Sequence, residues 1–388
     1  MDQQIDGGDN SRPPSCVEKV AFSIFKYFPY GGLQLDMMRI AKEFVRRGIK
    51  VELFCMDYDA EDAPPEITFR TLPAKGWAQH TQARNFEKQL AQVLKNEKFD
   101  AHISFSRVLP ADWYFAADFP VGDDAKRSLF QKLSLRYRTF AAMERNLFSV
   151  DNRTKILCST IHQQEMYQKL YNTPAERFFQ LPPGIDESFS QALSLRSKRD
   201  VLREKLGVTD DENLLIQVTS AFRTKGIDRS IAALASLPEN IRSKTRLLIV
   251  GRGKSAPYAK FASRCGVGEQ VIFAGGRSDV AELIAASDLM IHPARNEVTG
   301  TALLEALACG TPVLCSGNCG FAKLAKESGG VVLPRRFRQK ILNRTLMVLL
   351  STPGKLSDLQ MEAENYGKNG DFYRRAKAAV ELITGITE

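Results

Sequence analysis

The 388-residue chain has no apolar run that approaches the roughly 20 residues needed to span a bilayer. Its first residues, MDQQIDGGDNSRPPSCV, contain no apolar core of the kind found in secretory signals. We expect residues 1–17 to form a flexible tail. Low-complexity segments and short repeats are also missing. These absences predict a cytoplasmic globular protein.

Cysteine is sparse: there are seven, an odd number, and most lie in apolar runs, such as Cys55 in VELFCM and Cys158 in KILCST. This placement is typical of reduced core thiols and argues against a disulfide framework. Cys315 and Cys319 have the spacing of zinc ligands, but no second pair of Cys or His stands nearby. The sequence therefore predicts no metal site.

What is present is an ordinary soluble composition, with 44% apolar and 26% charged residues. The length exceeds that of one typical hydrophobic core and predicts two domains. The net charge of +9 is compatible with phosphorylated ligands, an anionic membrane or nucleic acid, so the placement of the charge has to decide.

Strand patterns alternate with helix patterns along the chain, which predicts parallel sheets covered on both faces. The alternation restarts after LPPGI (181–185), a natural hinge. The expected strands of the first half are Val20–Phe25, Val51–Met56, Ile67–Leu72, His102–Phe105 and Lys155–Ser159. Those of the second half are Leu214–Thr219, Leu247–Val250, Val271–Ala274, Leu289–His292 and Val313–Cys315. The fold class is α/β, with two doubly wound domains at residues 18–183 and 184–370.

Ligands of doubly wound sheets bind beyond the carboxyl ends of the strands. Gly31 and Gly32 lie between the first strand and a helix expected from Leu33, where glycine lets the backbone approach a phosphate. An ordinary tight turn is the alternative.

The segment NEVTGTALLEALACGTP (296–312) places Glu297 before Gly300 and a helix start near Thr301, with Glu305 on the first turns of that helix. Free amides and the positive end of the helix dipole suit a diphosphate. One carboxylate can then accept hydrogen bonds from a sugar and the other from a ribose. Two solvated glutamates beside an apolar helix are the alternative.

Arg223 and Lys225 follow the strand Leu214–Thr219, where fixed cations can neutralise a diphosphate leaving group. A basic surface loop is the alternative. Gly251-Arg252-Gly253 is half of a dinucleotide fingerprint, but the acidic residue that should end the next strand is missing. A nicotinamide oxidoreductase remains an alternative that the absence of NAD binding would remove.

The segment KRSLFQKLSLRYRTFAAMER (126–145) interleaves basic residues with aromatic and leucine residues. A basic helix of this kind can lie on an anionic membrane surface, or it can pack on its own domain with a solvated basic face. No nucleic-acid-binding module accompanies it, so nucleic acid is not expected as a partner. The basic residues expected at the membrane are Lys126, Arg127, Lys132, Arg136 and Arg138.

Several of these segments together resemble the retaining glycosyltransferases of family 4, which have the GT-B fold, and within them the lipopolysaccharide core glucosyltransferases. The resemblance runs from Lys19 to the C-terminus. It is carried by FKYFPYGGLQLDMMRIA (25–41), LRYRTFAAMER (135–145), KGIDRSIAALASLPE (225–239), RSDVAELIAASDLMIHPA (277–294) and TGTALLEALACGTPVL (299–314).

The resemblance implies a role for each matching residue. Lys225 would pair with the donor phosphates, Glu297 would hold the donor sugar, and Glu305 the ribose. Arg277 would meet the base, and Asp36 would lie near the donor sugar. The phosphate site would be completed by Gly31, Gly32 and the amides of Gly300, Thr301, Ala302 and Leu303. The final helix, within residues 371–388, would return to the first domain.

The implied reaction is transfer of glucose from UDP-glucose to an inner-core heptose, with retention and without a metal or cofactor, at the cytoplasmic face of the inner membrane. The family's adjacent Arg-Lys pair is altered, because Thr224 takes the arginine's place and Arg223 lies one residue earlier. A family 4 transferase with another donor or acceptor, a sugar-nucleotide epimerase, and a non-catalytic membrane-associated scaffold of the same fold are the alternatives.

Overall fold

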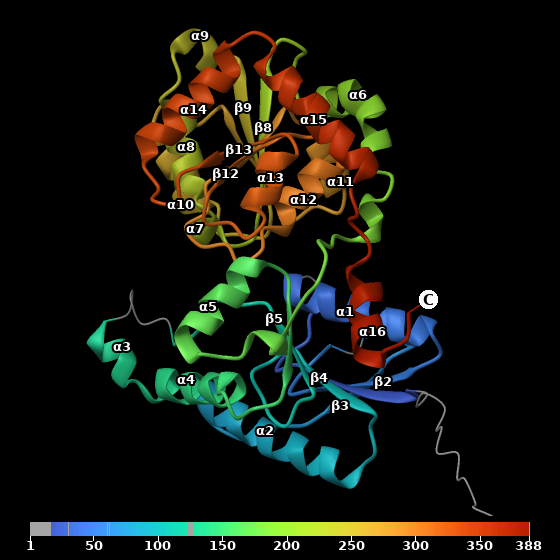
Figure 1. Cartoon of the computed structure of the whole chain (residues 1–388). Helices are drawn as coiled ribbons and strands as arrows, with labels where there is room; N and C mark the ends of the chain where they lie inside the picture. Colours follow the sequence, from blue (N-terminus) through green and yellow to red (C-terminus); the bar gives the residue numbers. More distant parts are fainter. Residues whose placement is uncertain (1–16, 30, 60, 62, 123–127, 388) are drawn as a thin grey trace, which may run out of the picture. The chain divides into compact units, whose positions relative to one another are not determined.

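The computed structural model describes residues 17–29, 31–59, 61, 63–122 and 128–387 (Figure 1). Its described residues form two sheets, of seven and six strands. The first sheet has the spatial order β3 (Thr68–Thr71), β2 (Lys50–Cys55), β1 (Lys19–Ser23), β4 (Ala101–Ser104), β5 (Trp113–Ala116), β6 (Lys155–Cys158) and β7 (Phe178–Gln180). The second has the order β10 (Val271–Gly275), β9 (Thr245–Val250), β8 (Asn213–Val218), β11 (Leu289–His292), β12 (Val313–Ser316) and β13 (Gly330–Leu333).

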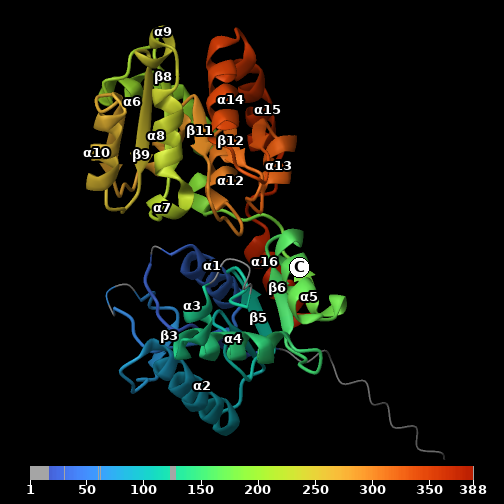
Figure 2. The same ribbon diagram turned by 90° about the vertical axis from the view of Figure 1, so that its left-hand side faces the viewer.

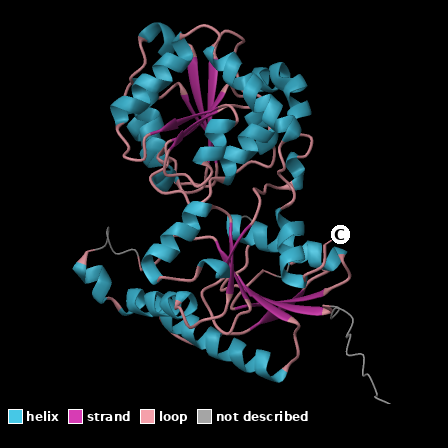
Figure 3. Cartoon of the chain, viewed as in Figure 1, coloured by secondary structure: helices cyan, strands magenta, loops and turns pink. Residues whose placement is uncertain are grey.

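Helices lie on both sides of the strands in each sheet (Figure 3). The first half contains α1 (Gly32–Arg46), α2 (Gln79–Asn96), α3 (Leu129–Leu133), α4 (Leu135–Phe148) and α5 (Ile161–Tyr171). The second contains α6 (Arg199–Lys205), α7 (Phe222–Lys225), α8 (Ile227–Ala235), α9 (Glu239–Arg242), α10 (Ala256–Arg264), α11 (Val280–Ala285), α12 (Thr301–Ala308), α13 (Ala322–Glu327), α14 (Gln339–Ser351), α15 (Lys355–Asn369) and α16 (Arg375–Thr384).

The second sheet is buried on both faces, as the apolar strands predict. Leu214 and Ile216 of β8 belong to one apolar core, whereas Leu215 between them belongs to the other. The same alternation continues along β9, β11 and β12. Figure 2 shows this domain turned by 90°, with α8 and α10 beside β8 and β9. The expected α/β class is therefore confirmed.

Strand order fixes where each domain can hold a ligand. In the second sheet β8 lies between β9 and β11, so the chain leaves β8 toward one side and later returns on the other. All of its strand pairs are parallel. The first sheet repeats this order, with the reversal between β1 and β4. Loops that follow the two strands at such a reversal border a crevice at the carboxyl edge of the sheet.

By contacts, the chain divides into two compact units. The first comprises Met1–Phe115, Asp124–Ile156 and Ala379–Glu388, and the second comprises Ala116–Asp123 and Leu157–Ala378. By strand order, β7 still belongs to the first sheet. The boundary expected at 183/184 lies between the sheets but is not the contact boundary, and it stays a prediction. The last residues, Ala379–Glu388, are grouped with the first unit by contacts.

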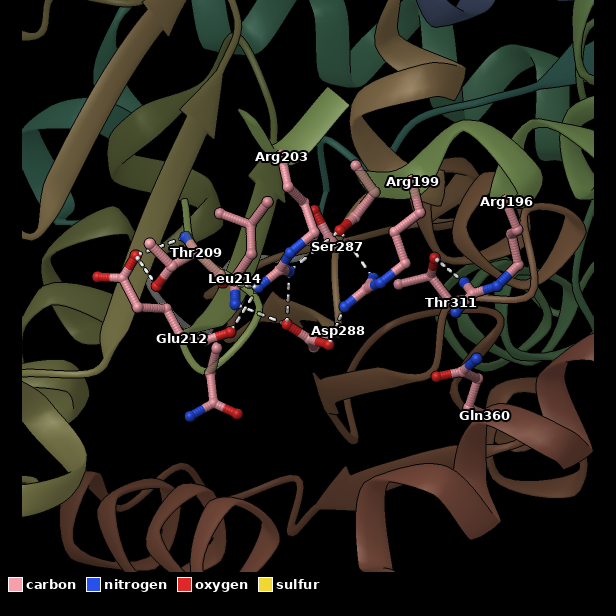
Figure 4. A network of polar contacts seen from close by, with 12 residues as sticks. Arg196, Arg199, Arg203, Thr209, Glu212, Leu214, Ser287, Asp288, Thr311 and Gln360 are labelled. Atoms are coloured by element: carbon pink, nitrogen blue, oxygen red, sulfur yellow. Dashed lines mark hydrogen bonds and ion pairs between the residues drawn. The ribbon is translucent and has the colours of Figure 1, made fainter. Parts of the chain in front are cut away.

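A buried arginine network holds the segment before β8 to the second sheet (Figure 4). Arg203 of α6 is 2% exposed and donates to the Asp288 carboxylate (3.1 Å) and to the Thr209 carbonyl (2.8 Å). Asp288 also accepts from Arg199 (2.5 Å) and from the Leu214 amide (2.7 Å). The guanidinium groups therefore join α6 to the starts of β8 and β11.

The basic stretch differs from its expectation in one respect: it forms two helices, α3 and α4, where we expected one. Ser134 stands between them in an extended conformation, and its hydroxyl accepts from the Tyr137 amide (3.2 Å) as the N-cap of α4. Lys126, Arg127 and residues 1–16 lie outside the described residues. None of the described helices combines the length and the apolar character that crossing a bilayer requires.

Candidate active site

The reversal point of the second sheet brings together two residues that the sequence predicts as functional. Lys225 ends α7, the short helix after β8, and Glu297 lies in the loop after β11. The Lys225 ammonium lies 2.5 Å from Oε2 of Glu297. The two loops thus place an ion pair at the carboxyl edge where β8 and β11 adjoin.

Glu297 is buried, and a third residue supports its charge. His292, the last residue of β11 and 1% exposed, has Nε2 at 3.0 Å from the same carboxylate oxygen. Burial opposes ionisation, but the hydrogen bond to His292 and the charges of His292 and Lys225 prevail and lower the pKa of Glu297 to about 2. Glu297 is therefore an anion at neutral pH.

Lys225 is held by its backbone as well as by its charge. Its carbonyl accepts from the Gln217 side chain (2.7 Å), which in turn accepts from the Ser230 hydroxyl (2.7 Å). Gly226 ends α7 with φ of 76°, and a Cβ there would meet the Pro293 carbonyl oxygen at 2.4 Å. Glycine is thus needed for the turn after Lys225 to pack against the loop that carries Glu297.

Arg295 joins the same two loops by side-chain contacts. Its guanidinium binds both carboxylate oxygens of Asp228 (2.8 and 2.6 Å) and the Arg223 carbonyl (2.8 Å). Its own carbonyl accepts from Asn318 in the loop after β12 (2.6 Å). Contacts within the protein therefore hold three segments at the carboxyl edge together.

The start of α12 lies in the same loop as Glu297. Gly300 is its N-cap, with φ of 90°, and Thr301 and Ala302 form its first turn. First-turn amides have no partner within a helix and suit an anion. The Leu303 amide donates to the Gly300 carbonyl (2.9 Å), and the Leu303 side chain is fully buried. Thr301 and Ala302 are thus the better placed of the predicted amides.

The other residues expected at the donor in the second unit are more exposed. Arg223 has a solvent-exposed side chain, and Glu305 is half-buried on α12. Arg277 is paired with Asp279 through two contacts (2.8 and 2.5 Å). The structure therefore groups Lys225, Glu297 and the start of α12, whereas the side-chain hydrogen bonds of Arg277 go to Asp279.

The first unit carries the remaining predicted residues around the start of α1. Gly31 is the N-cap of α1, and a Cβ there would meet Oε1 of Gln34 at 2.0 Å, whereas Gly32 has open space around it. Asp36, on the second turn, pairs with Arg39 (3.0 Å). These residues follow β1, at the reversal point of the first sheet.

Sequence reasoning missed His292, Gln217 and Arg295. A usable signal existed for His292, because a polar residue ends an otherwise apolar strand five positions before Glu297. No comparable signal marks Gln217, which lies inside β8. Within the described residues, no group of three or more His, Cys, Asp or Glu side chains is arranged to hold a metal ion.

Of the expected membrane residues, Lys132 lies on α3, and Arg136 and Arg138 lie on the first turn of α4. Around them Phe130, Leu133 and Leu135 are 86%, 71% and 67% exposed. Phe140, by contrast, packs on the core of the first unit and against Phe25. Within the described part of the segment 126–145, the exposed apolar side chains thus lie on α3 and at the start of α4.

Comparison with known proteins agrees with this architecture. A family model for group 1 glycosyl transferases matches residues 198–370. The lipopolysaccharide glucosyltransferase WaaG of Escherichia coli (strain K12) is 37% identical over 369 residues, which cover 94% of this chain and 98% of that protein. The crystal structure of WaaG superposes with a TM-score of 0.88, covering 95% of this chain and 100% of the other.

A more distant structure, Anabaena Alr3699/HepE in complex with UDP-glucose, is 17% identical with a TM-score of 0.72, over 95% of this chain and 100% of that one, and shares the fold. Two doubly wound parallel sheets with these relatives define a glycosyltransferase of the GT-B fold class. Within that class, the chain belongs to the group 1 glycosyl transferases.

Proposed function

We propose that the chain transfers glucose from UDP-glucose to an inner-core heptose of lipopolysaccharide, with retention of configuration. The observation that carries this proposal is the 37% identity to a lipopolysaccharide glucosyltransferase over nearly the full length of both chains. The Lys225–Glu297 pair at the reversal point of the second sheet supports the donor half of the reaction.

The residues of the second unit would divide the donor among them. The Lys225 ammonium and the Thr301 and Ala302 amides would face the diphosphate, whose negative charge grows as the glycosidic bond breaks. Glu297 would accept hydrogen bonds from glucose hydroxyls, and Glu305 from the ribose. Arg223, which is exposed, would add a second cation, and Arg277 would approach the base.

In the first unit, the backbone at Gly31 and Gly32 would approach the donor phosphates, and Asp36 would lie near the donor sugar. The acceptor hydroxyl would attack from the face that the diphosphate leaves, and the departing phosphate would take its proton. Fixed protein cations would supply the charge that a metal ion supplies in other transferases, so we expect turnover in a chelator.

We also propose that α3 and the start of α4 rest on the cytoplasmic face of the inner membrane, where a lipid-linked acceptor is found. Three exposed apolar side chains beside Lys132, Arg136 and Arg138 support this. Such a surface combines apolar insertion with attraction to anionic lipid.

The experiment is to measure UDP release from UDP-glucose in EDTA, with and without a heptose-terminated lipopolysaccharide acceptor. We expect release that depends on the acceptor. Glu297→Gln, which keeps the size of the side chain, should lose most of the activity while the protein keeps its far-UV circular dichroism. Near-normal turnover of this variant would remove the role of Glu297. UDP release without acceptor would point to hydrolysis of the donor, and no release with this acceptor would point to another donor or acceptor.

A further inference from the structure

A hollow in the first unit lies between α2 and α4, which run side by side in Figures 1 and 2. Its volume is about 580 Å³. Small residues of α4, Thr139, Ala141 and Ala142, leave room in its floor, and Tyr137 forms part of its wall. The remaining lining residues are His80, Thr81, Arg84, Asn85, Lys88, Leu135, Arg138 and Arg145, and no carboxylate is among them.

Four exposed cations face this groove from both sides. Arg84 and Lys88 are one turn apart on α2, and Arg138 and Arg145 are two turns apart on α4, so each pair shares a helix face. Within the described part of the chain, none of these four side chains forms an ion pair or a hydrogen bond. Arg84 interacts electrostatically with Glu87, one turn further along α2, but no carboxylate lines the groove itself.

The acidic residues of the two helices are turned to other partners. Glu87, the one acid of α2, accepts from the Leu109 amide (2.9 Å). Glu144, the one acid of α4, is fully buried and pairs with Arg107 (2.7 Å). Elsewhere in the same unit arginines are paired with carboxylates, as in Arg70 with Glu97. The groove thus has four cations in its lining and no carboxylate.

We propose that the groove between α2 and α4 binds the phosphoryl group of a phosphate ester. A phosphoryl group brings up to two charges and several acceptor oxygens, which suits guanidinium groups converging from two helices. The Asn85 and Thr81 side chains add polar groups at the same wall. The ester is either a lipid headgroup or a phosphorylated saccharide. The groove is separate from the proposed donor site and does not depend on it.

The test is calorimetric titration of the full-length protein, with UDP in excess so that phosphoryl probes cannot occupy the proposed donor site. The probes are glucose 6-phosphate and dihexanoyl phosphatidic acid below its micelle concentration, with glucose as the uncharged control. We expect saturable binding of a phosphoryl probe and none of glucose. Binding of the sugar phosphate identifies a saccharide source, and binding of the lipid alone identifies a headgroup.

Two double variants locate the binding. Arg84→Gln with Lys88→Gln on α2, and Arg138→Gln with Arg145→Gln on α4, should each weaken it by about tenfold or more, because charged hydrogen bonds are lost. The matched control removes two charges at the C-terminal end of α2 and just beyond it, Lys95→Gln with Lys98→Gln, and should leave binding unchanged. If one groove variant lowers the melting temperature, the binding measured with the other groove variant tests the proposal.

The proposal is overturned if neither phosphoryl probe saturates the protein. It is also overturned if the control pair weakens binding as much as the groove pairs do, because the effect would then come from net charge.

Discussion

At Glu297 two opposed forces act on one carboxylate, and their balance gives a pH dependence. Burial disfavours the charge, but His292 and Lys225 lower its pKa to about 2 in the folded protein, against 4.5 as the ordinary value. A depressed folded pKa stabilises the protein above the ordinary pKa, and this contribution is lost as pH falls toward 2. Its size is on the order of 3 kcal/mol.

We therefore expect wild-type protein to lose more unfolding free energy than Glu297→Gln between pH 4.5 and pH 2, since the amide does not titrate. Urea unfolding at intervals across this range measures the difference, and other carboxylates cancel between the two proteins. Parallel pH profiles would mean that Glu297 is not stabilised as an anion.

His292 contacts Glu297, so in the proposed reaction it would be a positioning residue that acts through that carboxylate. His292→Phe leaves the buried carboxylate with one hydrogen bond fewer, and losing a buried partner costs about 1–3 kcal/mol, or roughly ten- to a hundredfold in kcat/KM. His292→Gln can still donate from its side-chain amide and should recover much of that loss. Kinetics with the donor varied separate the two variants, and equal activity of both would leave His292 without this role.

The sequence indicated which residues to consider for the site, but not which of them contact one another. Lys225 and Glu297 were predicted as functional, and the structure pairs them. That pairing could not be foreseen, because 72 residues separate them and their distance depends on the adjacency of β8 and β11. His292 lies only five residues before Glu297 and was missed although a polar residue at the end of an apolar strand is a usable signal.

Among the elements, α6 is held to the second sheet by a network of paired charges. Arg203 is 2% exposed and bonded to Asp288 and to two carbonyls. Arg203→Ala removes one partner of a buried ion pair, which costs on the order of 3–5 kcal/mol. Arg199→Ala, whose side chain is 24% exposed, should cost less. Denaturant unfolding of both variants tests this order, and equal losses would contradict it.

The expected elements match the structure where strands are long and apolar. Leu289–His292 was predicted to the residue, whereas β5, β7 and β13 were missed. Strands of three or four residues give little periodicity, so a short strand such as β11 is found only where its neighbours in sequence also mark it. The break between α3 and α4 had a signal in Ser134, whose hydroxyl caps α4. The dense basic pattern on both sides of it suggested one helix instead.

For the whole molecule, a net charge of +9 and a pI of about 9.1 predict attraction to anionic vesicles that salt weakens. Salt screens this electrostatic attraction over a distance of about 10 Å at 0.1 M and about 3 Å at 1 M. The exposed Phe130 and Leu133 add a component that salt does not screen. Each side chain would contribute roughly 1.5–3 kcal/mol when buried in lipid.

The two components can be separated by two variants of the full-length protein in co-sedimentation with vesicles containing phosphatidylglycerol. Lys132→Gln with Arg136→Gln should weaken binding at low salt and make little difference at high salt, where charge is screened. Phe130→Ser with Leu133→Ser should weaken it at both, because insertion persists when screening is complete. Since both pairs lie within the same two helices, a shared response to salt would mean that net charge, and not α3, brings the protein to the membrane.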